Sequence, residues 1–164
     1  MGSGKSAVGR RLARGLEWRF IDMDREVVRE AGRSIAAIFR SEGEEGFRAR
    51  EAAVGERLQR LSGVVISSGG GWACVPGRLE SLAPGTLSVW LRVSAGEAWR
   101  RLEGSRVRRP LLEVDDPLGR IRVLLEEREP HYREALWHLD TDGRTARVIA
   151  EEIRDRLAAF GATG

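Results

Sequence analysis

The chain of 164 residues contains 41% hydrophobic and 32% charged residues, the balance expected of one ordinary globular domain with its own core. The net charge is +3, and acidic residues are interspersed with arginines throughout, so we expect a mixed solvated surface and no nucleic-acid partner. No apolar run reaches the roughly 20 residues that span a bilayer, so we expect no membrane partner. No signal peptide is visible, and Cys74 is the only cysteine, so we expect the protein to be cytoplasmic.

Helical and strand patterns alternate along the chain, which predicts an α/β fold with a mostly parallel sheet flanked by helices. In the N-terminal half we predict a helix over 5–16, a strand over 18–21, helices over 25–32, 35–43 and 44–61, a strand over 63–68, and a short helix over 76–82. In the C-terminal half we predict a strand over 86–93, helices over 94–103 and 117–129, one or two helical turns over 131–137, a strand over 138–141, and a closing helix over 144–160. Residues 104–116 fit neither pattern and are predicted to form an exposed, arginine-rich loop.

The sequence Gly2-Ser3-Gly4-Lys5-Ser6 lies directly before the first predicted helix. A helix start offers unpaired N–H groups to an anion, and glycines let the backbone approach that anion closely. Lys5 is the only lysine among 28 basic residues, and its compact ammonium suits a phosphate oxygen, while the hydroxyl of Ser6 suits Mg²⁺. The segment matches the end of the pattern G-x-x-x-x-G-K-[ST], which favours a phosphate-binding loop over a glycine-rich start without a ligand.

Two carboxylates, Asp22 and Asp24, follow the first predicted strand at positions i and i+2. The ends of strands in α/β sheets are where ligands bind. One carboxylate there can hold Mg²⁺ through water, and the other can accept a hydroxyl proton. Taken alone, the pair is equally compatible with a helix cap and a neighbouring surface residue.

Three glycines, Gly69, Gly70 and Gly71, follow the strand predicted over 63–68. Glycines at a strand end suggest a substrate in contact with bare backbone, although a flexible turn explains them equally well.

Three arginines stand in unusual settings: Arg48 follows GEEGF at a helix start, Arg109 precedes PLL in the irregular loop, and Arg128 lies shortly before Pro130. A planar guanidinium recognises a carboxylate or a phosphoryl group, whereas each arginine alone is more simply a surface residue.

Taken together, the stretches MGSGKSAVGRRLA, FIDMD, GRSIAAIFRSEGEEGFRAREA, VVISSGGG, RPLL and REPHYREA resemble the shikimate kinase family of P-loop small-molecule kinases. The resemblance covers essentially the whole chain, so we expect one domain over 1–164, with a substrate-binding helical segment over about 24–61 and a lid over about 104–116. It implies phosphorylation of the 3-hydroxyl of shikimate by ATP, with Mg²⁺, in aromatic amino-acid biosynthesis. We expect the enzyme to act as a monomer.

The resemblance also implies roles for individual residues. It assigns ATP to Gly2, Ser3, Gly4, Lys5, Ser6 and Ala7, with Arg109 closing over the phosphates and a loose match at Arg144. It assigns Mg²⁺ to Ser6 and Asp22, and shikimate to Asp24, Arg48, Gly69, Gly70, Gly71 and Arg128. Lys5, Asp24 and Arg109 are the expected catalytic residues, with Asp24 as the base.

Two departures from the family pattern qualify these expectations. P-loop kinases have a buried strand before the loop, and we expect this strand to be missing from the recorded chain, either because the sequence starts at an internal methionine or because the chain is naturally short. Trp72 follows the triple glycine where a small residue is usual, so its indole is expected to crowd the substrate site. The alternatives are therefore a related kinase for another acidic hydroxylated acceptor and a non-catalytic relative that binds a ligand.

Overall fold

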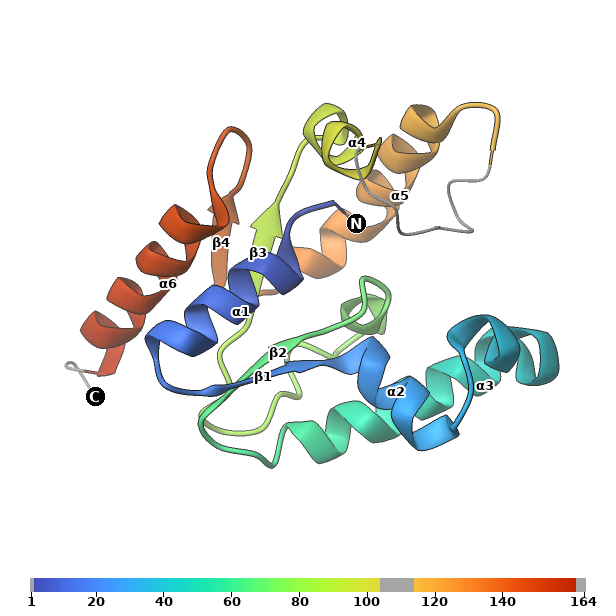
Figure 1. Cartoon of the computed structure of the whole chain (residues 1–164), viewed down its shortest axis with the longest axis horizontal. Coiled ribbons are helices and arrows are strands. Elements are labelled where there is room, and N and C mark those ends of the chain that lie inside the picture. The colour runs from blue at the N-terminus through green and yellow to red at the C-terminus, as the bar shows by residue number, and fades with distance from the viewer. Residues whose placement is uncertain (1, 104–113, 162–164) are drawn as a thin grey trace.

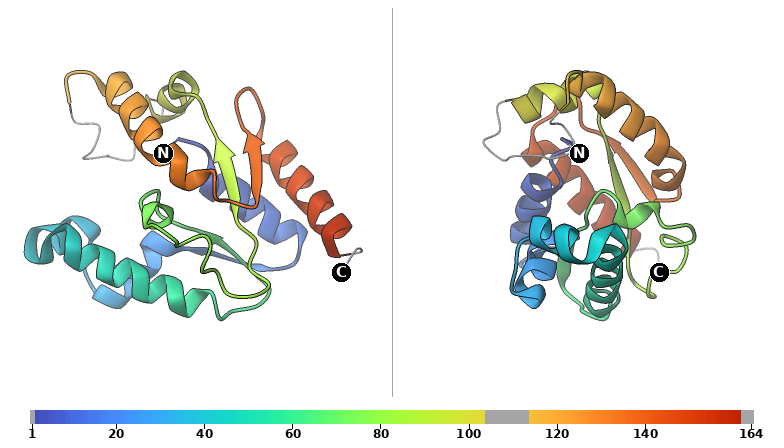
Figure 2. Two further views of the ribbon diagram at one scale, coloured as in Figure 1. Left: turned by 180° about the vertical axis from the view of Figure 1, so that it is seen from behind. Right: turned by 90° about the vertical axis from the view of Figure 1, so that its right-hand side faces the viewer.

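Four short strands form two parallel pairs in the computed structural model, which describes residues 2–103 and 114–161 of the chain. β1 (Arg19–Asp22) pairs with β2 (Val64–Ser67), and Asp22 lies opposite Ser67 where the two strands end. β3 (Val89–Arg92) pairs with β4 (Trp137–Asp140). Helices surround both pairs (Figures 1 and 2), so the predicted α/β class with parallel strands is confirmed.

The helices are α1 (Lys5–Gly15), α2 (Met23–Ala31), α3 (Ile35–Leu58), α4 (Ala95–Glu103), α5 (Pro117–Tyr132) and α6 (Ala146–Gly161), and a 3₁₀ turn, η1 (Trp72–Cys74), follows the triple glycine. Ser34 caps α3 by accepting a hydrogen bond from the Ala37 N–H at 3.2 Å, as its position before the helix indicates. Gly43 breaks α3 with a φ of 71°, at the boundary predicted between two helices. Within the described ranges, no helix is both long enough and apolar enough to cross a membrane.

Three predicted elements differ from the structure. α5 continues through Pro130 to Tyr132, because the missing N–H falls in the last turn and the Arg133 N–H still reaches the Glu129 carbonyl at 3.0 Å. Residues 76–82, predicted to be helical, form turns around Gly77, whose φ is 70°. The strand predicted over 86–93 shortens to β3, since its partner β4 is only four residues long. Other boundaries shift by a few residues at most.

α1 is held against α6 by apolar side chains that recur at helical spacing. Val8 and Leu12 of α1 pack with Ile149 and Ile153 of α6 and with Leu139 of β4. All five side chains are buried. This packing fixes the direction in which α1, and therefore its first turn, points.

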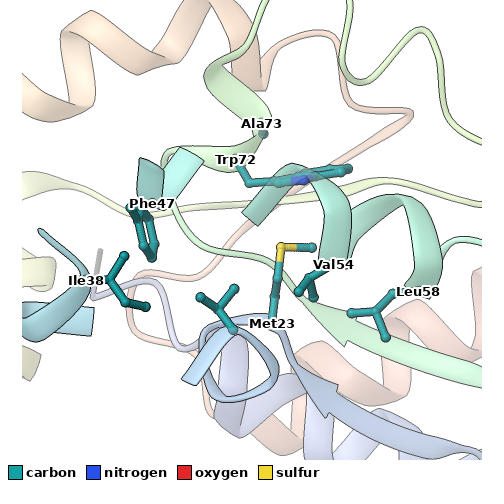
Figure 3. Packing of buried hydrophobic residues seen from close by; sticks show 8 residues of the cluster. Met23, Ile38, Phe47, Val54, Leu58, Trp72 and Ala73 are labelled. Atoms are coloured by element: carbon teal, nitrogen blue, oxygen red, sulfur yellow. The ribbon is translucent and has the colours of Figure 1, made fainter. Parts of the chain in front are cut away.

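Trp72 belongs to a hydrophobic cluster separate from the one between α1 and α6. Its side chain is 6% exposed and packs with Met23, Phe47 and Val54 (Figure 3). Its indole Nε1 is buried against Gly55 of α3 and has no hydrogen-bond partner among the described residues. The indole therefore lies in the core rather than over the glycines, which corrects the expectation that it crowds the substrate site.

Gly55→Ala is expected to destabilise the protein. An added Cβ would lie 2.5 Å from Trp72 Nε1, and overpacking of this kind costs about 1–3 kcal/mol. The better helix propensity of alanine offsets about 1 kcal/mol of that cost. Urea unfolding should therefore give a lower free energy of unfolding. Gly96→Ala is the matched control, since this helical glycine has no heavy atom within 4 Å of the added Cβ, and equal stability of the two variants would contradict the prediction.

Candidate active site

The first turn of α1 follows a glycine in the left-handed conformation, and the residues before it are packed against a neighbouring helix. Gly4 caps α1 in the left-handed region with a φ of 84°, a conformation that favours glycine. Ser3 is only 6% exposed, and a Cβ on Gly2 would lie 2.8 Å from the Cα of Ala98 in α4. Because a helix start directs backbone N–H groups outward, this turn is suited to bind an anion.

Ser6 and Asp22 place a hydroxyl and a carboxylate side by side. The Ser6 hydroxyl donates to Asp22 Oδ2 at 3.3 Å, so the start of α1 lies against the end of β1. Asp22 also caps α2 by accepting the Arg25 N–H at 3.4 Å. No cluster of three or more acidic, histidine or cysteine side chains suited to a metal occurs in the described part of the chain. Mg²⁺ bound through phosphates needs only one or two protein oxygens, so these two residues fit it.

Asp24, in the first turn of α2, faces the triple glycine. A Cβ on Gly69 would lie 3.1 Å from Asp24 Oδ1. Burial and the neighbouring charge of Asp22 raise the pKa of Asp24, whereas the positive charges of Lys5 and Arg48 lower it. The carboxylate therefore lies within electrostatic reach of both the phosphate loop and the expected substrate arginine.

The other two glycines face the two arginines. A Cβ on Gly71 would lie 2.6 Å from both terminal nitrogens of Arg48, and a Cβ on Gly70 would lie 3.0 Å from Arg128 Nη1. None of the three glycines has a positive φ, so a special turn conformation does not explain them. They are glycines because a side chain would displace Asp24, Arg48 or Arg128. We call Gly69–Gly71 the glycine wall.

Two of the predicted site residues are not placed at this centre. Arg109 lies outside the described residues. Arg144 donates to the Asp140 carbonyl at 3.0 Å and forms an ion pair with Glu152 of α6. Its partners therefore lie in β4 and α6 rather than in the phosphate loop.

The model of the family described as shikimate kinase matches residues 1–158. This chain belongs to the shikimate kinase family. A shikimate kinase of Synechococcus sp. (strain RCC307) is 43% identical over 157 residues, which cover 96% of this chain and 80% of the relative. The shikimate kinase of Symbiobacterium thermophilum is 42% identical over 166 residues, and the match covers 100% of this chain and 95% of that relative.

Solved structures of shikimate kinases share the fold. The enzyme from Acinetobacter baumannii, solved in complex with shikimate, superposes with a TM-score of 0.88 at 36% identity, covering 97% of this chain and 89% of that one. The enzyme from Aquifex aeolicus gives a TM-score of 0.84 at 33% identity, covering 100% and 95%.

Two residues of this candidate site were not predicted from the sequence. Glu51 is 2% exposed, and its Oε2 accepts from Arg48 Nη1 at 2.6 Å, while its buried Oε1 faces Gly69 without a hydrogen-bond partner among the described residues. Burial raises the pKa of Glu51, against the lowering effect of Arg48. The Tyr132 hydroxyl donates to the Gly70 carbonyl at 2.6 Å, and burial raises the pKa of Tyr132 to about 12. Helical spacing could have indicated both residues: Glu51 lies three positions after Arg48, and Tyr132 lies four positions after Arg128, so each shares a helix face with its arginine.

Arg101 also supports the phosphate loop of this family member. Its guanidinium donates to the Gly2 carbonyl at 3.4 Å, to Thr141 Oγ1 at 3.1 Å and to the Thr141 carbonyl at 2.6 Å. Thr141 is completely buried. No local sequence pattern predicts these contacts, because Arg101 is far from Gly2 and from Thr141 in the sequence.

Proposed function

We propose that this chain transfers the γ-phosphoryl group of ATP to the 3-hydroxyl of shikimate, giving shikimate 3-phosphate for aromatic amino-acid biosynthesis. The observation that carries the proposal is the convergence of Asp24, Arg48 and Arg128 on the glycine wall, with Asp24 within electrostatic reach of Lys5. The bound shikimate in the Acinetobacter baumannii relative supports the same acceptor here.

Arg48 and Arg128 are proposed to bind the carboxylate of shikimate. Guanidinium groups form paired, charge-assisted hydrogen bonds with carboxylates. Glu51 holds Arg48 from the buried side, which limits the rotamers that Arg48 can adopt. Two guanidinium groups on one wall favour an acidic acceptor over a neutral nucleoside, and the glycine wall lets the acceptor touch the backbone of Gly69–Gly71.

Asp24 is proposed to accept the proton of the acceptor hydroxyl. A general base works best when its pKa approaches the working pH, and burial raises the pKa of Asp24. The carboxylate also faces Gly69, so a hydroxyl lying on the glycine wall is within its reach.

The phosphate side of the site is proposed to bind ATP through the backbone of residues 2–7 and the ammonium of Lys5. Phosphoryl transfer depends mainly on positioning and on neutralising charge. Mg²⁺, held by Ser6 and Asp22, would supply further positive charge at the phosphates. A phosphate contact of Arg109, a lid over 104–116 that excludes water, and a nucleotide contact of Arg144 are carried by the family resemblance alone.

The proposal describes a monomer acting in the cytoplasm, with no nucleic-acid or membrane partner. Its site is built from one chain, since Lys5, Asp24, Arg48 and Arg128 all converge within it. Cys74 is the only cysteine, which agrees with a reducing compartment.

ADP release measured in a coupled assay should depend on both shikimate and Mg²⁺. The methyl ester of shikimate is the matched acceptor, because it keeps the hydroxyls and loses the charge that Arg48 and Arg128 recognise. Its kcat/KM is expected to be at least about tenfold lower. ATP turnover that is equal with and without shikimate would contradict the proposal. Absence of ATP binding in a nucleotide titration would favour a non-catalytic relative.

A further inference from the structure

Gly43 divides α3 into a first half over 35–42 and a second half over 44–58. Its φ of 71° and ψ of −170° are not helical, and the ribbon changes direction at this point of α3 in Figure 1. The second half carries Arg48, which is proposed to bind the carboxylate of the acceptor, and Glu51, which holds Arg48. A group that fixes the angle at Gly43 therefore also affects how Arg48 meets the glycine wall.

Glu42, the last residue of the first half, folds back over the second half. A Cβ added to Gly46 would lie 2.4 Å from the Cβ of Glu42 and 3.1 Å from its Oε2. In an uninterrupted helix, Cβ atoms four residues apart lie about 5–6 Å apart, so the break at Gly43 brings these two positions much closer. Glycine is a poor helix former, and here Gly46 leaves the space that the Glu42 side chain occupies.

The carboxylate of Glu42 connects arginines on both sides of the break. Arg50, in the second half, donates to Glu42 Oε2 from Nε at 2.8 Å and to Oε1 from Nη2 at 3.0 Å, which is a two-point contact. Arg33, which precedes α3, forms an ion pair with Glu42 Oε1. The Glu42 side chain is 25% exposed, against 39% for Arg33 and 40% for Arg50, so the carboxylate lies at the centre of the group. We call Arg33, Glu42 and Arg50 the α3 clamp.

We propose that Glu42 is a positioning residue for recognition of the acceptor. By holding Arg50 and packing on Gly46, it fixes the angle of the second half of α3. That angle sets the direction from which the Arg48 guanidinium reaches the carboxylate of the acceptor. Residues two positions apart on a helix do not face each other, so the α3 clamp acts on Arg48 through the helix backbone, whereas Glu51 holds the guanidinium itself. The inference rests on the proposed function, because it requires an acidic acceptor bound by Arg48.

The test measures kcat/KM for shikimate and for its methyl ester in the wild-type chain and in Glu42→Gln. Glutamine keeps the size of the side chain and removes its charge. The preference for shikimate over the ester is expected to fall about three- to fivefold, as for the loss of one arginine–carboxylate pair. The fall should come from a higher KM for shikimate with kcat nearly unchanged, because Arg48 binds a part of the acceptor that does not react. A general defect in folding affects both acceptors equally and cancels in this ratio.

Glu45→Gln is the matched control, since Glu45 is an exposed glutamate in the second half of the same helix. It removes the same charge and should leave the preference for shikimate unchanged. Arg50→Gln should repeat the effect of Glu42→Gln, and the double variant should be little worse than either single variant, because the two side chains act as a pair.

Two outcomes would overturn the inference. The first is a preference for shikimate that is the same in Glu42→Gln, in Glu45→Gln and in the wild-type chain. The second is a loss of kcat/KM in Glu42→Gln that is equal for the two acceptors, which would make Glu42 a structural residue only. Failure of the proposed function is distinguishable from both, because the wild-type chain would then release ADP at the same rate with and without shikimate.

Discussion

Asp24→Asn is expected to lower the rate of shikimate-dependent ADP release by about 10²- to 10⁴-fold, the usual contribution of a positioned general base. Asparagine keeps the size and the hydrogen-bonding capacity of the side chain, but it cannot accept a proton. The loss of activity is therefore expected to appear as a lower kcat at saturating ATP and shikimate, whereas the KM for ATP should change much less.

The same variant separates a catalytic role from a structural one. The pKa of Asp24 is raised above its ordinary value of 3.8 in the folded chain. Asp24 therefore favours folding when the pH is below 3.8, and this contribution to stability is lost as the pH rises through the folded pKa. The ionised carboxylate is half-buried and partly desolvated, and asparagine removes that cost. The midpoint of thermal unfolding at pH 7 should therefore stay the same or rise while activity is lost.

Asp155→Asn serves as the matched control. Asp155 lies in α6, where its exposed carboxylate accepts from Arg154 at 3.0 Å, and its loss should leave activity and stability nearly unchanged. An Asp24→Asn enzyme that keeps more than a tenth of the wild-type kcat would contradict the role of base. A large drop in its unfolding midpoint would point instead to a structural role.

Elements with local signals were predictable from the sequence. Val8 and Leu12 mark the buried face of α1 by their helical spacing, Ser34 caps α3 through its own hydroxyl, and Gly43 breaks that helix through its φ. The helix end predicted before Pro130 was wrong because a proline in the last turn costs only one hydrogen bond, and the Tyr132 hydroxyl makes another, to the Gly70 carbonyl, in the same turn.

The candidate site depends on contacts between distant parts of the chain, and local patterns do not encode these. Asp24, Arg48 and Arg128 were singled out by residue type and by the family resemblance, but only the fold shows that each faces one glycine of the wall. Glu51 escaped notice because a glutamate three residues after an arginine usually forms a solvated helix pair. Its burial, which makes it part of the site, is a property of the assembled core.

Lys5→Arg is expected to lower kcat by about 10²- to 10³-fold, although the positive charge is kept. The ammonium of lysine is compact and sits on a flexible stem, so it can follow the phosphoryl group as charge moves in the transition state. The guanidinium is a wider, rigid plane. Here it would have to fit beside Gly4, where the Arg101 guanidinium already lies 3.9 Å from the position of an added Cβ.

Arg14→Lys is the matched control, because it is the reverse substitution at an exposed position. Arg14 lies in the last turn of the same helix, α1. It should leave kcat within about twofold. ATP titrations of both variants separate binding from chemistry: weaker ATP binding alone would place Lys5 in ground-state recognition, whereas a lower kcat at saturating ATP places it at the moving phosphoryl group. A Lys5→Arg enzyme as active as the Arg14→Lys enzyme would mean that charge suffices at this position, and that the only lysine of the chain was not retained for its shape.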